Sequence, residues 1–387
     1  MKRLSALAAT AMLALCFGAS QAVAMEGGPG AAQAAGQSAG SGQSASGGSG
    51  AYQLGPSNNA GSIRVLSPGD NGSVTQSNST TAAAVAANAN KTDQTVDQSQ
   101  TGGGYGSDST QIAGQEARNA QKADADATAK QFGAKNDALS IRVLSPGDDG
   151  DVTQSNSVGA GALAANGNTT DQSVDQSQAG GGKGSDATQL AGQEAGSHQS
   201  ADADATAVQV KPSNTATSIR VLSPGDDGNV TQSNSTTALA AALNLNHTDQ
   251  SIDQQQSGGY GSDYLQVAGQ GAWSGQHADA DATAIQLGAK NEYTPVRVLS
   301  PNHKDKKHGK GKKREDAKAP HGGSVEQSNA VGAFGLALNL NGTHQSLLQK
   351  QPGHGSSGLQ VGGQGSWSGQ YGSADAFGLQ GVMRAKE

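Results

Sequence analysis

The sequence predicts an all-β fold, a repeat β-solenoid of stacked, cross-β-like strands that follows a disordered N-terminal segment. The first observation is a long repeat: a motif built on "RVLSP" recurs at offsets of 78, 78 and 77 residues, its copies starting at Ser62, Ser140, Ser218 and Pro295. The second is an alternation of residue types, with a period of two, inside each copy. A faithful long repeat is typical of stacked units, and a period of two is that of a β-strand.

Composition limits the functions that such a chain can have. The 387 residues include 57 glycines, 34% hydrophobic residues and 3% aromatic residues, which leaves little material for a conventional globular core. No Ser-His-Asp arrangement recurs in the repeats, and no phosphate-binding glycine loop precedes a helical pattern. We therefore expect a protein that is not an enzyme and that needs no cofactor.

Residues 1–24 predict a cleaved secretory signal peptide. Lys2 and Arg3 precede an apolar run, and the small-residue site "AVA" ends at Ala24. A lipid anchor at Cys16, the one cysteine of the sequence, is the alternative, but the bulky Leu15 beside it disfavours that interpretation. No later apolar run reaches the roughly 18 residues that a membrane helix needs. We expect a secreted protein, extracellular or at the cell surface, without a membrane span.

Residues 25–61 are low-complexity Gly, Ser, Ala and Gln, a composition that predicts a disordered tether. The repeats follow it. Their predicted bounds are 62–139, 140–217, 218–294 and 295–387, the last with a basic insertion at 302–323.

The amide side chains share one parity along each predicted strand. Because successive side chains of a strand point to opposite faces, they should form one face, with small alanines between them as in "ADADATAIQ" (278–286). Stacked amides can form ladders of hydrogen bonds, so this is the candidate assembly face. In the third repeat its members are Gln232, Asn234, Asn244, Asn246, Gln250, Gln254, Gln266, Gln270, Gln276 and Gln286. A helix remains the alternative for the alanine-rich segment 80–90.

Aspartates take the opposite parity. Asp279 and Asp281 should therefore face water, where they discourage unwanted edge pairing. Copies stacked directly on one another would crowd these like charges, so we expect the strands of successive copies to be offset or separated. Leu239, Leu243, Leu336 and Leu338 replace smaller residues of earlier copies, which predicts that 218–387 is the better packed half.

Two hexapeptides, "QFGAKN" (131–136) and "QLGAKN" (286–291), resemble the Gln-x-Gly-x-x-Asn element of the curlins, secreted bacterial subunits of functional amyloid. The repeat of 78 residues is much longer than a curlin rung, and "IRVLSPGD" has no curlin counterpart. The resemblance implies self-assembly of the chain into a homopolymer.

Two acidic motifs are candidates for weak calcium binding. "GGYGSDYLQ" (258–266) fits the calcium-binding β-roll pattern, but its relatives around Asp108 and Asp186 occur once per long repeat. "SPGDDGD" (145–151) is a common turn signature, with Pro fixing φ and Gly taking a positive φ. We interpret both as corners of the solenoid and expect no metal ligands. The histidines show no recurring ligand spacing.

The insertion 302–323 carries eight basic and three acidic residues, a charge of +5 on a chain of net charge −7. Such a patch suits contact with an anionic surface polymer, although a solvated loop is an equal alternative. It holds no aromatic residue to stack on a base, so we expect no specific nucleic-acid recognition. The candidate contact residues are Lys306, Lys307, Lys310, Lys312, Lys313 and Arg314.

Two functions fit these patterns. One is a structural subunit that assembles through its amide-rich strands into extracellular fibres or a surface coat of the biofilm-matrix type. The alternative is a cell-surface adhesin that presents the acidic face and the basic loop to a partner.

Overall fold

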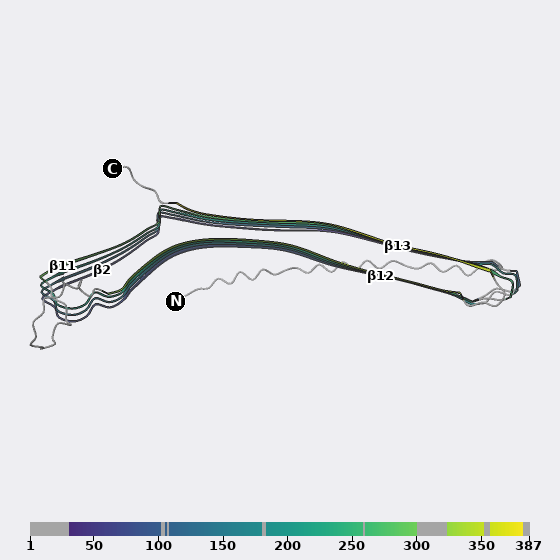
Figure 1. Cartoon of the computed structure of the whole chain (residues 1–387), viewed down its shortest axis with the longest axis horizontal. Helices are drawn as coiled ribbons and strands as arrows, with labels where there is room; N and C mark the ends of the chain where they lie inside the picture. The colour runs from purple at the N-terminus through teal and green to yellow at the C-terminus, as the bar shows by residue number, and fades with distance from the viewer. Residues whose placement is uncertain are drawn as a thin grey trace, which may run out of the picture.

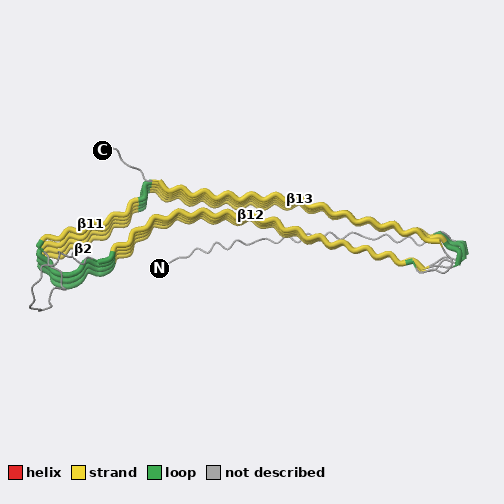
Figure 2. The backbone as a smooth tube through the Cα atoms, viewed as in Figure 1, coloured by secondary structure: helices red, strands yellow, loops and turns green. Residues whose placement is uncertain are grey.

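The computed structural model describes residues 31–101, 105–106, 108–179, 183–257, 260–299, 323–351 and 357–381. These residues form thirteen β-strands in three sheets whose neighbouring strands are all parallel, which confirms the predicted all-β solenoid. Two long layers run side by side along the molecule, and short strands lie beyond them at one end (Figure 1). Irregular corners join the layers at both ends of the molecule (Figure 2).

Each sheet collects one strand from every turn of the chain. Sheet A contains β1 (Ala31–Leu54), β4 (Ser109–Phe132), β7 (Ala187–Val210), β10 (Asp263–Leu287) and β13 (Ser357–Gly381). Sheet B contains β2 (Ser57–Val65), β5 (Lys135–Val143), β8 (Ser213–Val221) and β11 (Lys290–Val298). Sheet C contains β3 (Val74–Thr101), β6 (Val152–Ala179), β9 (Val230–Ser257) and β12 (Val325–Lys350).

One repeat makes one rung of the stack. The chain passes through sheets A, B and C in turn and then returns to sheet A one strand higher. Because the repeat length equals the path of one rung, each residue lies beside its own equivalent, as Gln154 lies between Gln76 and Gln232. The segment 80–90 belongs to β3, so the helical alternative is wrong.

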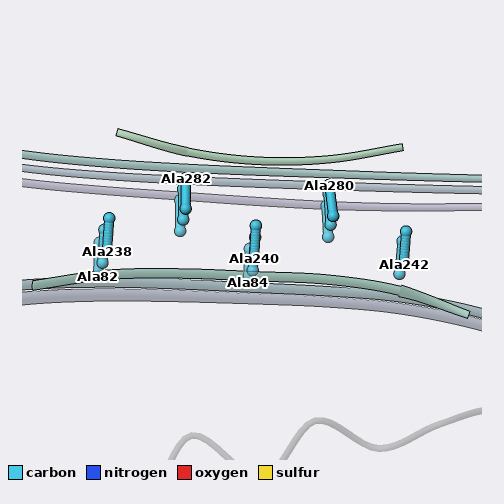
Figure 3. Close-up of a cluster of buried hydrophobic side chains, with 14 of the residues drawn as sticks. Ala82, Ala84, Ala238, Ala240, Ala242, Ala280 and Ala282 are labelled. Carbon is cyan, nitrogen blue, oxygen red and sulfur yellow. The ribbon is translucent and has the colours of Figure 1, made fainter. Parts of the chain in front are cut away.

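The core between sheets A and C is built mainly from alanine. Ala280 and Ala282 of β10 point toward Ala238, Ala240 and Ala242 of β9 and interdigitate with them (Figure 3). These side chains are at most 1% exposed. A methyl group lets two flat sheets approach closely along their whole length, which a larger side chain would prevent. The sheets therefore bury a long and thin apolar layer in place of a globular core.

The prediction of a disordered tether over 25–61 is wrong for its described part. Residues 31–54 form β1, which pairs in register with β4, and residues 57–61 begin β2. Despite its composition, β1 keeps glutamine at every position where β4 has a ladder glutamine, as at Gln43 opposite Gln121. Backbone pairing and these amide bonds order the segment. The predicted repeat starts consequently lie inside the strands of sheet B, and the described part of the first rung starts with β1.

Of the leucines on which the packing prediction rests, Leu239, Leu336 and Leu338 do not enter the core. Leu239 is 50% exposed, and Leu336 and Leu338 lie on the same outer face of sheet C, which leaves them 42% and 39% exposed. Their parity along the strand is opposite to that of the buried amides and alanines. The prediction that 218–387 is the better packed half therefore gains no support from these three leucines.

The corners depend on stacked glycines. Gly225 has φ of +141°, and an added Cβ would lie 2.2 Å from the carbonyl oxygen of Gly147 in the rung below. We expect Gly225→Ala to lower the free energy of unfolding by about 1 kcal/mol or more, because alanine is strained at this φ and clashes with backbone. Gly161→Ala is the matched control, since nothing lies within 4 Å of its added Cβ. Denaturant unfolding checks the pair, and equal midpoints would contradict the account.

Candidate functional site

The candidate assembly face lies inside the stack. All ten predicted amide residues are buried, those from Gln232 to Gln254 on β9 and those from Gln266 to Gln286 on β10. The two strands face each other across the core, where Asn244 and Gln250 of β9 donate to backbone carbonyls of β10, whereas Gln232 bonds to β11 of sheet B. Equivalent residues of every rung lie in the same columns.

Ladder glutamines such as Gln276 and Gln250 tie neighbouring rungs together and also join the two long sheets. Gln276 Nε2 donates one hydrogen bond of 2.8 Å to Gln199 Oε1 in the rung below. It donates a second bond of 3.0 Å to the carbonyl oxygen of Leu340 in sheet C. Gln250 uses the same pattern, donating to Gln172 Oε1 at 2.8 Å and to the carbonyl oxygen of Gly271 at 3.1 Å. Buried amides are therefore satisfied by their own repeat equivalents and by facing backbone.

The glutamine and asparagine ladders run in opposite directions. Glutamines donate from the later rung to the earlier one, as Gln345 does to Gln250 at 2.8 Å. Asparagines donate from the earlier rung to the later one, as Asn166 does to Asn244 and Asn244 to Asn339, at 2.9 and 2.8 Å. The two ends of the stack consequently differ in which donors and acceptors they present.

Sequence analysis missed a charged ladder at the corner between sheets B and C. Arg142 and Arg220 are fully buried, and Asp149 lies between them, its two carboxylate oxygens 2.8 and 3.2 Å from their Nε atoms. Asp227 bridges Arg220 and Arg297 in the same way. The signal was present, because the motif "SIRVLSPGD" carries Arg and then an acid or amide seven residues later in the first three copies. The motif has the composition of a turn. Only the in-register stacking of the rungs brings its charged side chains into contact.

Asp149 is held ionised within this ladder. Burial acts against the charged form, but hydrogen bonds from Ser140, Ser218 and Arg142 outweigh it and hold the pKa of Asp149 below its ordinary value. Each carboxylate is shared between two guanidinium groups. Its negative charge offsets the repulsion between arginines that stack directly on one another.

The acidic motifs considered for calcium serve the corners. Asp148 Oδ1 accepts a bond of 2.7 Å from the backbone N–H of Asp226 in the next rung. Asp186 Oδ1 likewise accepts from the N–H of Asp263 at 3.3 Å. Part of the "GGYGSD" turn, residues 258–259, lies outside the described residues. These two aspartate side chains therefore accept hydrogen bonds from backbone N–H groups of the neighbouring rung.

The expectation that successive copies avoid stacking their aspartates is wrong. Asp126, Asp204 and Asp281 lie directly beside one another in register on the outer face of sheet A. The pKa of Asp204 is raised, first by burial and then by the charges of Asp126 and Asp281. The pKa of Asp171 in sheet C is raised in the same way, by burial and by Asp93. The core alanines and amides fix the register. The outer aspartates therefore lie beside one another despite the repulsion between their charges.

One group of side chains in the described part of the chain could hold a metal ion. Ligand atoms of Asp202, His277 and Asp279 all lie within 4.8 Å of one another on sheet A. The His277 ring also stacks on Tyr371 of β13, with 5.0 Å between the ring centroids. Sequence spacing could not reveal the group, because it joins residues of two rungs.

No family model, curated protein or solved structure matches the chain. The likeness to the curlins therefore rests on the two hexapeptides and on the amide-lined rungs. The basic candidates from Lys306 to Arg314 lie outside the described residues. Within the described ranges, no helix is long and apolar enough to cross a bilayer.

The charged ladder can be tested by removing one guanidinium group. We expect Arg220→Met to lower the free energy of unfolding by about 3–5 kcal/mol, because Asp149 and Asp227 would remain buried with half of their compensation. Arg64→Met is the control, since half-buried Arg64 bonds to the neutral Asn71 at 2.8 Å. Denaturant unfolding measures both variants. An equal loss in the two would show that the shared carboxylates do not matter.

The acidic columns predict a stability that depends on pH. A raised folded-state pKa contributes stability that is fully present below the ordinary value of 3.8 and is lost as pH rises through the raised value. The unfolding midpoint should therefore rise as pH falls from 7 toward 4. Below 3.8 the gain should reverse, because the stabilisation from Asp149, whose pKa is lowered, is lost there.

Neutralising one acidic column should weaken the dependence on pH above 4. We expect the variant with Asp126→Asn, Asp204→Asn and Asp281→Asn to unfold at a higher midpoint than the parent at pH 7, and to differ less from it at pH 4. Denaturant titrations at the two pH values measure this. A parent midpoint that falls steadily from pH 7 to 4 would contradict the prediction.

Proposed function

We propose that the protein is a structural subunit that self-assembles, rung upon rung, into extracellular fibres or a surface coat of the biofilm-matrix type. The observation that carries the proposal is the complementarity of the two ends of the stack. At both ends of the stack, the amide ladders have donors or acceptors without a partner among the described residues. A ladder that ends in a donor at one end of the stack ends in an acceptor at the other.

At the C-terminal end, none of the described residues donates to Gln345 Oε1, which ends its ladder as an acceptor. Asn339 there donates to the carbonyl oxygen of Tyr371 and keeps a second N–H. At the N-terminal end the roles are reversed. Gln94 Nε2 donates to the carbonyl oxygen of Glu116 and keeps a second N–H, while Asn88 Oδ1 is an acceptor without a described donor. A second copy placed on top continues both ladders.

This pairing has a direction. A copy that stacks head to tail joins glutamine donors to glutamine acceptors and asparagine donors to asparagine acceptors. Two copies that meet at like ends would place donor against donor. Head-to-tail contacts give an open linear assembly when each unit follows the last by translation along the stack, without a rotation that closes a ring. The end strands of sheet C support this, because β3 and β12 are 28 and 26 residues long and act as templates for a further strand.

Secretion, fibre formation and contact with anionic surface polymers belong to the same proposal. The predicted signal peptide supports export, and the resemblance to the curlins supports assembly of an amide-rich fibre. The basic insertion at 302–323 would place cationic side chains on such a fibre at regular intervals. The adhesin alternative depends on that insertion, which lies outside the described residues.

The proposal is tested with the purified chain lacking residues 1–24. We expect fibres whose X-ray pattern has the roughly 4.7–4.8 Å meridional spacing of stacked strands. Preformed fibres should seed further growth. A chain that stays monomeric under all concentrations and pH values, while its circular dichroism shows the folded β structure, would refute assembly.

The ladders, and not the acidic columns, should control assembly. Gln276→Leu with Gln286→Leu keeps the alternation of residues but leaves ladder partners such as Gln199 Oε1 without donors, a loss of about 1–3 kcal/mol for each site. We expect a longer lag in thioflavin fluorescence and a higher soluble concentration at the end of growth. Asp279→Asn with Asp281→Asn is the matched control on the same strand and should assemble as fast as the parent or faster. Assembly unchanged by the glutamine pair would show that the ladders within each copy do not control assembly.

A further inference from the structure

Two adjacent columns of side chains on the outer face of sheet A differ in charge. Strand β7 pairs in register with β4 on one side and with β10 on the other, so equivalent residues of the three strands are neighbours along the stack. From β4 to β10, the acidic column contains Asp124, Asp202 and Asp279. In the same order, the second column contains Lys122, Ser200 and His277. Both columns lie on one face, because their members are two residues apart on each strand.

The first of these three rungs supplies a cation for its own aspartate. Lys122 Nζ lies 2.8 Å from a carboxylate oxygen of Asp124. In the lysine's column, β7 has a serine and β10 has His277. Asp202 and Asp279 are therefore direct neighbours without a lysine of their own, and like charges in register repel each other.

The register brings the ligand atoms of three residues together. One such atom each from Asp202, His277 and Asp279 lies within 4.8 Å of the other two, and all three residues are half-buried. Asp279 Oδ1 is buried and has no hydrogen-bond partner among the described residues. A carboxylate oxygen in this state has lost its hydration without a compensating bond, so a bound cation would stabilise it.

An aromatic ring of the next rung positions the imidazole. The ring of Tyr371 stacks on that of His277, with 5.0 Å between the ring centroids and 14° between the ring planes. Stacking occupies a face of the imidazole, whereas its two nitrogen atoms, which can coordinate a metal, lie at the edge of the ring. A side chain that is already held in place loses less conformational entropy when it binds a ligand.

We propose that Asp202, His277 and Asp279 form a binding site for a divalent transition-metal ion such as Zn²⁺, which links two rungs of sheet A. Zn²⁺ binds both imidazole nitrogen and carboxylate oxygen, whereas Ca²⁺ prefers about six to eight oxygen ligands. The two positive charges of the ion offset those of the two carboxylates, and three protein ligands leave one position for water. The site is complete within one copy of the chain, so the inference does not rest on assembly.

The next acidic column on the same strands is a matched comparison. Asp204 of β7 and Asp281 of β10 are also direct neighbours in register. The column beyond them holds Thr206 and Thr283, which supply no imidazole. Among the described residues, only the group that includes His277 brings three ligand atoms this close together. The histidine therefore distinguishes the site from a pair of stacked carboxylates.

Calorimetric titration of Zn²⁺ into the purified chain lacking residues 1–24 tests the site. The sequence contains eight histidines, so the decisive quantity is the difference between the parent and each variant. His277→Ala and Asp202→Asn should each remove one equivalent of bound Zn²⁺, or weaken its binding by more than about tenfold, because each variant loses one of three ligands. Asp204→Asn is the control and should bind Zn²⁺ as the parent does.

Two results of the titration would overturn the inference. One is unchanged binding in Asp202→Asn, a variant that keeps the shape of the side chain and so serves even where His277→Ala does not fold. The other is an equal loss of binding in Asp204→Asn, which would mean that the acidic face attracts cations without a defined site.

Denaturant unfolding separates the metal classes. Because Zn²⁺ would bind the folded state, it should raise the unfolding midpoint of the parent and of Asp204→Asn more than that of Asp202→Asn. Ca²⁺ at the same concentration should raise the midpoint of the parent less than Zn²⁺ does. An equal effect of the two ions on the parent would overturn the assignment to a transition metal.

Discussion

The structure depends on parallel, in-register stacking, which places each side chain directly beside its own equivalent. A residue is then suited to a column only if it tolerates or gains from contact with itself. The carboxamide gains, because it is both donor and acceptor and can bond to an identical neighbour in either direction. A carboxylate loses, because like charges meet at the spacing of one strand. The separation of amides to the inside and aspartates to the outside follows from this single constraint.

Arginine and aspartate satisfy the same constraint by a different route. A column of Arg64, Arg142, Arg220 and Arg297 would repel itself, but Asp149 and Asp227 each lie between two guanidinium groups. Arg142 and Arg220 each lie seven positions before an aspartate of the same rung, and the carboxylate of Asp149 also reaches Arg220 in the next rung. Ion pairs therefore hold each corner to the neighbouring rungs, whereas amide hydrogen bonds and alanine packing hold the long strands together.

Much of this arrangement could be predicted from the sequence, because a repeat and a parity are local patterns. Period two identified which face carries Gln276 and Gln286, and the repeat of 78 residues predicted stacking. Composition was the weaker guide. It predicted disorder for 31–54, where a few glutamines at the correct spacing outweigh many glycines. It also suggested that Leu239 and Leu336 enrich the core, although their parity places them outside. The Arg220–Asp227 pairs and the Asp202–His277–Asp279 group need the register of the rungs, which one sequence does not contain.

The same stacking that stabilises the chain leaves its ends unfinished. A ladder has no natural last member, so an amide on β3 or β12 meets either water or another copy. Globular proteins cover or charge their exposed edges to avoid this. Here the outer columns of aspartate run along the stack and not across its ends, so they oppose lateral contact while leaving the axial edges open.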